Sequence, residues 1–383
     1  MMQPNKQGMI YVHVPFCASR CIYCDFYSTT LSAAVKEQYT LAACNELIQR
    51  IGYLPTSSIK SVYLGGGTPS QLSLSQLERL LSCIHANYQV SQHAEITLEC
   101  NPDDINEAFV KAIKSLGINR VSLGVQSFDD QILKLLNRRH NALGAVEAVN
   151  TLQANGIVNL SIDLIYGLPL QTIQSFKNDL IKAFSLPITH LSSYALSVEK
   201  STVLSKKIAC KELTLPNDKT FASEYNLLME EAKKHGFEHY EISNFSLKGY
   251  ASQHNSGYWD GTPYLGIGPG AHSFNGTTRR YNIPNLVEYI KQSKNNQFPH
   301  QTEHLSTAER YNELVFTSLR TKRGLSLAHV ERLFGKSQLN YLLSNAQTHI
   351  NSGRLLLSAD YLTLSPNHIF VSDDIISDLM IGE

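Results

Sequence analysis

The sequence predicts an α/β protein with a parallel sheet, followed by a small α+β domain. Through about the first 200 residues, short apolar runs alternate with amphipathic stretches, which is the pattern of repeated strand–helix units. After about residue 300 the pattern changes to helices and then short strands, which is typical of a winged-helix-like domain. At 383 residues the chain is long enough for more than one domain.

Six strand–helix units are predicted, and they suggest an incomplete barrel, although periodicity alone does not separate a barrel from an open sheet. The predicted strands cover residues 10–14, 61–64, 95–100, 120–125, 158–165 and 190–196. The predicted helices cover 31–51, 74–86, 105–116, 129–150 with a break near His140, and 172–184. Ligand groups are then expected at the carboxyl ends of the strands.

The second half of the chain is less regular. We expect a helix at 217–235, an edge strand at 240–242, and long functional loops in the Gly-, Asn-, Tyr- and His-rich segment 249–283. A charged helical segment begins near residue 302 and precedes predicted helices at 327–334 and 338–352 and strands at 355–357 and 361–364. We therefore divide the chain into a barrel core at 1–200, a segment at 201–300 that completes the barrel and carries ligand loops, and a C-terminal domain at 301–383.

Composition excludes several classes of function. The 33 basic and 33 acidic residues balance, which leaves no electrostatic footprint for nucleic acid. No run approaches the ~20 apolar residues of a membrane span, and the N-terminus has no apolar stretch suited to a signal peptide. The seven cysteines are an odd number, and Cys44, Cys83, Cys100 and Cys210 resemble small core residues rather than a disulfide framework. We expect a cytoplasmic protein.

Three cysteines fall within eight residues, at Cys17, Cys21 and Cys24, in the spacing C-x3-C-x2-C. A four-iron cluster held by only three thiolates keeps one iron open for a ligand that is not protein. A structural zinc site usually takes four protein ligands; no second C-x2-C pair is present, and His13, on a predicted strand, is a weak fourth candidate. A redox pair of Cys21 and Cys24 leaves Cys17 unexplained. We favour an open iron–sulfur site.

Other candidate residues follow successive predicted strands. Gly65-Gly66-Gly67-Thr68-Pro69 allows a sharp turn close to a ligand, or an ordinary strand-to-helix turn, and is not a P-loop because no Gly-Lys-Ser/Thr follows. Glu99 and Asp163 could accept hydrogen bonds from ribose hydroxyls or an ammonium group, or simply cap helices. Gln126 can donate and accept, and Arg138 could pair with a carboxylate or lie on a solvated helix face.

Together these blocks resemble the radical SAM superfamily, in which the open iron binds S-adenosylmethionine. GGGTP, Glu-x-Asn-Pro, SLGVQSF, LNRRH and SIDLIYGLP occur in the order found in oxygen-independent coproporphyrinogen III oxidase and its relatives. The resemblance implies a partial (β/α)6 barrel and a [4Fe–4S] cluster on Cys17, Cys21 and Cys24. The implied S-adenosylmethionine-binding residues are Tyr11, Tyr23, Gly66, Gly67, Thr68, Glu99, Gln126, Arg138 and Asp163.

Three features resemble the HemW-type heme chaperone branch rather than the oxidase. Phe26 stands where the oxidase has a further cysteine, and Cys17 lies too early for the oxidase's N-terminal extension. His254-Asn-Ser-Gly-Tyr-Trp259 matches the branch's HNxxYW signature, which implies heme as a ligand, with His254 as the first axial candidate and His272 as a weaker one. The implied partner is an apo-hemoprotein client, with possible peripheral contact with a membrane client. Coproporphyrinogen III decarboxylation is the enzymatic alternative.

Overall fold

The computed structural model describes residues 7–56 and 58–382, and it confirms the predicted α/β class. Twelve strands of this described part form one curved sheet in the order β12-β11-β10-β9-β1-β2-β3-β4-β5-β6-β8-β7. The neighbours from β9 through β1 to β6 run parallel. The six predicted strands are β1 (Gly8–Val14), β2 (Ser58–Gly66), β3 (Gln89–Cys100), β4 (Arg120–Gln126), β5 (Asn159–Tyr166) and β6 (His190–Ala195).

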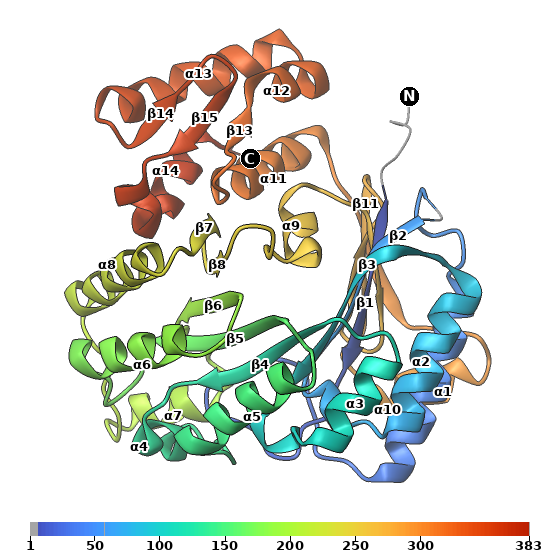
Figure 1. Cartoon of the computed structure of the whole chain (residues 1–383). Helices are drawn as coiled ribbons and strands as arrows, with labels where there is room; N and C mark the ends of the chain where they lie inside the picture. Colours follow the sequence, from blue (N-terminus) through green and yellow to red (C-terminus); the bar gives the residue numbers. More distant parts are fainter. Residues whose placement is uncertain (1–6, 57, 383) are drawn as a thin grey trace.

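Helices cover the outer face of the parallel strands, so the inner face encloses the interior of a partial barrel (Figure 1). The predicted break near His140 is confirmed, because two helices stand where the sequence pattern had one long amphipathic stretch. Side-chain caps fix several helix starts; Ser73 and Gln76 form a capping box that begins α2. The outer helices are α1 (Ala33–Gln49), α2 (Leu74–Asn87), α3 (Glu107–Ser115), α4 (Asp130–Leu135), α5 (Ala142–Ala154) and α6 (Ile173–Ser185).

The central strands are buried on both faces, as is typical of parallel sheets covered by helices. In β1, Ile10, Val12 and Val14 are fully buried in one continuous core that extends through the helices. After β6 the chain forms α7 (Val203–Ala209), α8 (Asp218–Lys234), β7 (Glu238–Glu241) and β8 (Asn244–Ser246). The edge strand expected at 240–242 is thus found as β7, paired antiparallel with β8.

The expectation of long loops at 249–283 is wrong. This segment forms α9 (Gln253–Trp259), β9 (Tyr264–Ile267), β10 (His272–Phe274) and β11 (Thr278–Asn282). β9 pairs in parallel with β1, so it extends the sheet. Helix α9 begins because Ser252 and the distant Glu95 accept hydrogen bonds from its first backbone amides, a tertiary cause that composition does not show.

The C-terminal residues form a domain with its own core. After α10 (Leu286–Ser293) and β12 (His300–His304), the chain gives α11 (Thr307–Leu319), β13 (Leu325–Ser326), α12 (Leu327–Phe334), α13 (Lys336–Asn351), β14 (Leu355–Leu357), β15 (Tyr361–Leu364) and α14 (Ser372–Leu379). The strand order β13-β15-β14, with the second and third helices between β13 and β14, matches the winged-helix-like expectation.

This domain lies over the end of the barrel where the parallel strands begin, next to α9 (Figure 1). Lys322 N–H donates to Tyr240 O at 3.0 Å, which ties the domain to the strand pair β7–β8. No helix within residues 7–56 and 58–382 is long and apolar enough to cross a membrane.

Candidate functional site

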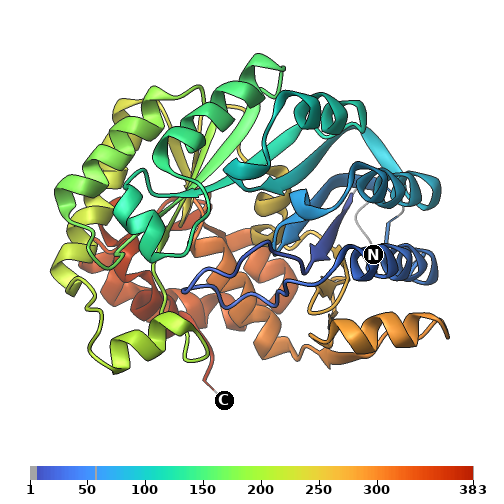
Figure 2. The ribbon, with the colours of Figure 1, turned by 90° about the horizontal axis from the view of Figure 1, so that it is seen from below.

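The three clustered cysteines lie on the loop that follows β1, at the carboxyl end of the parallel strands. Figure 2 looks onto this end and shows the loop crossing the mouth of the barrel. Cys17 N–H donates to Thr29 O at 2.9 Å and Thr29 N–H donates to Pro15 O at 2.7 Å, so the two arms of the loop are tied to each other, while Cys24 N–H closes a turn on Cys21 O at 3.3 Å. All three thiols are free and partly exposed. The loop therefore presents three sulfur ligands toward an open barrel end.

The thiols have polar neighbours from other strands. Arg138 Nη1 donates to Cys21 Sγ at 3.3 Å, and Thr68 Oγ1 donates to Cys17 Sγ at 3.6 Å. The guanidinium favours a negative sulfur. Burial raises the pKa of the Cys24 thiol to about 11, so Cys24 needs a metal to become a thiolate near neutral pH.

The donor set of the loop is three thiols, which fits an iron–sulfur cluster. In the described part of the chain, no three His, Cys, Asp or Glu side chains converge tightly enough to hold one metal ion. In a four-iron cluster each thiolate binds a different iron, so the three sulfurs stand further apart than around one ion. Cys17, Cys21 and Cys24 supply three thiols from one short loop, which is the donor type that such a cluster takes.

The glycine motif packs β2 closely against β1. Gly66 has a φ of 110°, and a Cβ there would lie 2.6 Å from His13 Nδ1. A Cβ on Gly67 would lie 2.8 Å from Phe16 O. The Gly66 N–H donates to Glu99 Oε2 at 3.0 Å. Glycine is therefore required for packing, and an ammonium group bound here can donate to backbone carbonyl oxygens or to Glu99.

Glu99 and Asp163 line one cavity of about 220 Å³ inside the barrel, together with Tyr11 and His254. Tyr63 OH donates to Glu99 Oε1 at 2.7 Å. Burial raises the pKa of Glu99 to about 7, against the opposing effect of the Tyr63 hydrogen bond. Burial also raises the pKa of Asp163. Glu99 can therefore accept or donate a hydrogen bond near neutral pH.

Gln126 and Arg138 lie nearer the cysteines. Gln126 ends β4 beside a β-bulge, and its φ of 71° is in the left-handed region. Such strain often marks a functional position. Arg138 Nη2 donates to Asn101 Oδ1 at 2.7 Å, and Asn101 Nδ2 donates to Thr68 Oγ1 at 3.4 Å. Asn101 thus connects two predicted residues.

Tyr23 is part of the cluster loop, where it lies close to Cys21, Cys24 and Arg138. Its pKa is raised, first by burial and then by the neighbouring Cys21 thiol. The phenol therefore stays protonated and acts as a neutral donor. Tyr11 lies deeper, where its hydroxyl is 3.1 Å from His13 Nδ1 and its ring stacks on Tyr63.

His254 is buried in α9 rather than exposed on a loop. Its Nδ1 is 2.9 Å from Ser61 Oγ, and its Nε2 is 3.0 Å from Tyr258 OH. Burial, with the positive charges of Arg120 and Lys60, lowers the pKa of His254 to about 3. The imidazole is neutral and both ring nitrogens are engaged, so ligation of iron requires that one of these hydrogen bonds break.

His272 is more accessible. It begins β10, is exposed, and stacks on Tyr281 with ring centroids 5.4 Å apart. Of the two heme-ligand candidates, His272 is therefore the one whose ring is exposed, whereas the His254 ring is buried.

Sequence reasoning missed several residues of the cavity. Arg120 and His190 line it, and neither stood out because each begins a strand. The signal that could have found them is a charged or titratable residue inside an otherwise apolar parallel strand. Asn101 was also missed, although it directly follows a strand end within the Glu-x-Asn-Pro block.

Comparisons with sequence families agree with the class of protein that this barrel and its three-cysteine loop define. The Radical SAM superfamily profile matches residues 11–182. The HemN C-terminal domain profile matches residues 305–371, which span most of the winged-helix-like domain. The solved structure of the coproporphyrinogen III oxidase HemN from Escherichia coli superposes with a TM-score of 0.85, covering 99% of this chain and 91% of that chain, at 22% identity. At that identity the match shows the fold alone.

Relatives of known name are more similar in sequence. The protein named heme chaperone HemW from Lactococcus lactis is 34% identical over 92% of this chain and 91% of its own length. The protein of the same name from Mycobacterium tuberculosis is 32% identical over 98% of this chain and 96% of its own. The chain belongs to the HemW family within the radical SAM superfamily. Its superfamily cofactors are a [4Fe–4S] cluster and S-adenosylmethionine.

Proposed function

We propose that this protein is a heme chaperone, which binds heme and transfers it to apo-hemoproteins with the help of a [4Fe–4S] cluster and S-adenosylmethionine. The observation that carries the proposal is the convergence of three thiols, Arg138 and Thr68 at the carboxyl end of the barrel. The HemW relatives, which align over most of both chains and are named heme chaperones, support heme as the cargo.

In this proposal Cys17, Cys21 and Cys24 hold the cluster, which when bound supplies a redox-active iron with one open coordination position. Arg138 places a positive charge beside Cys21, where it can pair with the carboxylate of S-adenosylmethionine. Glu99 and Asp163 accept hydrogen bonds from the ligand's hydroxyl or ammonium groups inside the cavity.

His254 and His272 remain the heme-ligand candidates. For His254, α9 would have to release either Ser61 or Tyr258 before a ring nitrogen could bind iron. For His272, the stacked Tyr281 leaves the exposed ring able to meet a ligand from solvent. Access therefore favours His272, whereas the HNxxYW signature favours His254.

Phe26 supports the chaperone over coproporphyrinogen decarboxylation. It is 62% exposed in the cluster loop, at the position where the oxidase has a cysteine. An exposed aromatic side chain beside the barrel mouth suits contact with an apolar ligand face or a client protein.

One experiment tests the choice. The protein is reconstituted anaerobically with iron and sulfide, and the same sample is titrated with heme and incubated with coproporphyrinogen III and S-adenosylmethionine. We expect stable heme binding, transfer to an apo-hemoprotein, and no decarboxylation. Decarboxylation without heme binding would overturn the proposal in favour of the oxidase.

A further inference from the structure

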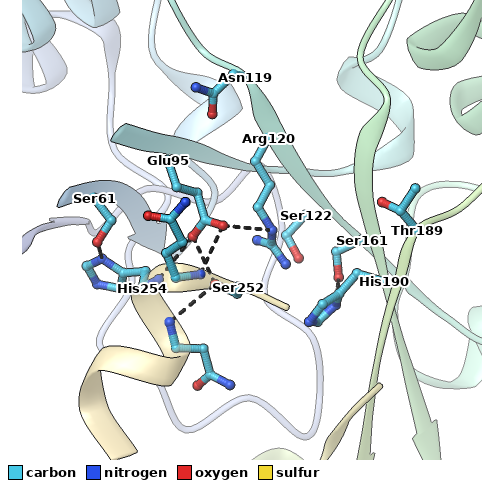
Figure 3. Close-up of polar contacts among 12 residues, drawn as sticks. Ser61, Glu95, Asn119, Arg120, Ser122, Ser161, Thr189, His190, Ser252 and His254 are labelled. Atoms are coloured by element: carbon cyan, nitrogen blue, oxygen red, sulfur yellow. Dashed lines mark hydrogen bonds and ion pairs between the residues drawn. The ribbon is translucent and has the colours of Figure 1, made fainter. Parts of the chain in front are cut away.

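The barrel interior contains a buried arginine that is poorly satisfied by the protein. Arg120, the first residue of β4, is 2% exposed and lines the 220 Å³ cavity. Figure 3 shows its guanidinium extending into the space between Glu95 and His190. Its Nε has no hydrogen-bond partner among residues 7–56 and 58–382. Burying a charge without such partners is costly, which suggests that a ligand completes the site.

Glu95 neutralises this charge without satisfying its donors. Its Oε2 is 3.9 Å from Arg120 Nε, beyond hydrogen-bond range. Instead, Glu95 accepts from Ser252 Oγ, Gln253 N and His254 N, each at 3.0 Å. The carboxylate is therefore committed to the N-terminus of α9, and the guanidinium stays available.

The neighbouring histidines do not compete for an anion. His190 Nδ1 is 2.7 Å from Ser161 Oγ, and its Nε2 is 2.9 Å from Tyr240 OH. Burial, followed by the Arg120 charge, holds the pKa of His190 well below its usual value. Because His254 is neutral for the same reasons, Arg120 is the cation that an anion entering this end of the cavity would meet.

We propose that Arg120 binds one propionate carboxylate of heme inside the barrel. The inference rests on the heme binding proposed above. A guanidinium presents a planar fork of donors that matches a carboxylate. Pockets that bury drug-sized ligands span ~300–1,000 Å³, so a cavity of about 220 Å³ admits a carboxylate arm rather than a whole porphyrin.

The carboxylate of S-adenosylmethionine is the other possible source. Arg120 lies six positions before Gln126 on β4, and a strand rises about 3.3 Å per residue, which places the two residues roughly 20 Å apart. Of the predicted S-adenosylmethionine residues, Glu99 and Asp163 line the same cavity as Arg120, whereas Gln126 and the cationic Arg138 lie at the other end of β4, near the cysteines. A methionyl carboxylate that pairs with Arg138 beside Cys21 is too far from Arg120 to bind both guanidinium groups.

The acidic side chains of Glu99 and Asp163, which also line the cavity, do not exclude a heme propionate. Burial raises the pKa of Glu99 to about 7 and also raises the pKa of Asp163. Glu99 is therefore partly protonated near neutral pH and repels an anion less than a full charge would. Ser122 Oγ donates to Asp163 Oδ1 at 3.2 Å, and this hydrogen bond partly offsets the negative charge of an ionised Asp163.

The test compares hemin with hemin dimethyl ester, in which both propionates are uncharged. Each is titrated into the full-length, cluster-reconstituted parent, Arg120→Gln, Arg120→Lys and the control Arg79→Gln, with Soret absorbance as the readout. Arg79 is half-exposed on the outer helix α2, where it pairs with Glu37. Circular dichroism and S-adenosylmethionine affinity check that each variant is folded.

We expect the parent and Arg79→Gln to bind hemin about 10-fold or more tightly than the ester, since a hydrogen bond to a charged group is involved. Arg120→Gln should lose that preference while its ester affinity and S-adenosylmethionine affinity stay unchanged, and Arg120→Lys should keep part of it. A parent that binds hemin and ester equally overturns the Arg120 assignment alone, and the parent comparison holds even where a variant fails to fold. The assignment is also overturned if Arg120→Gln still prefers hemin over the ester but binds S-adenosylmethionine more weakly than the parent. A parent that binds no hemin overturns the proposed function and this inference together.

Discussion

Arg138 donates from Nη1 to Cys21 Sγ at 3.3 Å and from Nη2 to Asn101 Oδ1 at 2.7 Å. One guanidinium thus joins the cysteine loop after β1 to the end of β3, although the three residues are far apart in sequence. Burial alone would lower the pKa of Arg138, but the neighbouring Tyr23 and Cys21 outweigh that effect and leave the pKa raised. A permanently charged group at this position stabilises negative sulfur and can bind an anionic cofactor group.

The cysteine loop gives the first prediction. Replacing any one of Cys17, Cys21 and Cys24 with Ala should abolish the cluster after anaerobic reconstitution. The cluster needs three thiolates, and the loop has no further cysteine to replace a lost one. Iron and sulfide content and the charge-transfer absorbance check this. Cys210→Ala is the control, since Cys210 is exposed just after α7 and takes no part in the loop. Full iron and sulfide content in all three variants would remove the cluster assignment.

Arg138 gives the second prediction. Arg138→Gln should keep a cluster but bind S-adenosylmethionine about 10-fold or more weakly, since a charge-assisted hydrogen bond is lost. Equilibrium binding to the reconstituted protein measures this. Arg139→Gln is the matched control. The Arg139 side chain is next in sequence, is one-third exposed, and pairs with Asp104 instead of a cysteine. Equal affinities in the two variants would show that Arg138 does not contact the ligand.

Glu99 predicts a dependence of stability on pH. Its folded pKa is raised to about 7 from an ordinary value of 4.5, so the folded state holds a proton that the unfolded state releases. Its contribution to stability is therefore present below about pH 4.5 and is lost as pH rises through about 7. Between pH 5 and 8 the parent should lose more free energy of unfolding than Glu99→Gln does.

Urea denaturation of both proteins at the two pH values measures this difference. Glu107→Gln serves as the control, because Glu107 is an exposed residue of α3 that pairs with Lys111. Parallel stability profiles for the parent and Glu99→Gln would mean that Glu99 is ionised in the fold at pH 5.

The glycine motif predicts a packing effect. Gly52→Ala places a side chain at a φ of 87° in open space, so it should cost only ~1–2 kcal/mol of backbone strain. Gly66→Ala adds a contact of 2.6 Å with His13 at a φ of 110°, and overpacking costs a further ~1–3 kcal/mol. Urea denaturation of the two variants separates strain from packing. Equal losses would mean that β1 and β2 move apart at no cost.

Sequence patterns predicted the βα units well, because each buried strand and amphipathic helix has a local signature. Glu99 lies next to the end of β3, where a ligand group is expected, whereas Asp163 lies in the middle of β5 and still lines the same cavity. The helix at 253–259 could not be predicted, because its start depends on Glu95, more than 150 positions away. Arg120 was missed because a charged residue at the start of a strand is compatible with exposure; the structure shows instead that it lines the cavity, and that its Nε has no hydrogen-bond partner among the described residues.

The last prediction concerns the axial ligand of heme. His254 is enclosed, and its ring contacts both Ser61 and Tyr258, so His254→Ala removes a structural hydrogen-bond pair as well as a candidate ligand. His272→Ala removes an exposed ring that stacks on Tyr281. If access decides, His272→Ala should shift the Soret band or lower the heme stoichiometry, with the melting temperature unchanged.

His254→Ala should then lower the melting temperature and leave the heme spectrum as in the parent. His254→Gln separates the two roles, because an amide can keep one hydrogen bond to Ser61 or Tyr258 but is a poor ligand for heme iron. A parental spectrum in His272→Ala together with an altered one in His254→Gln, at parental stability, would identify His254 as the ligand. It would also require that α9 rearranges when heme binds, because both His254 ring nitrogens are otherwise engaged.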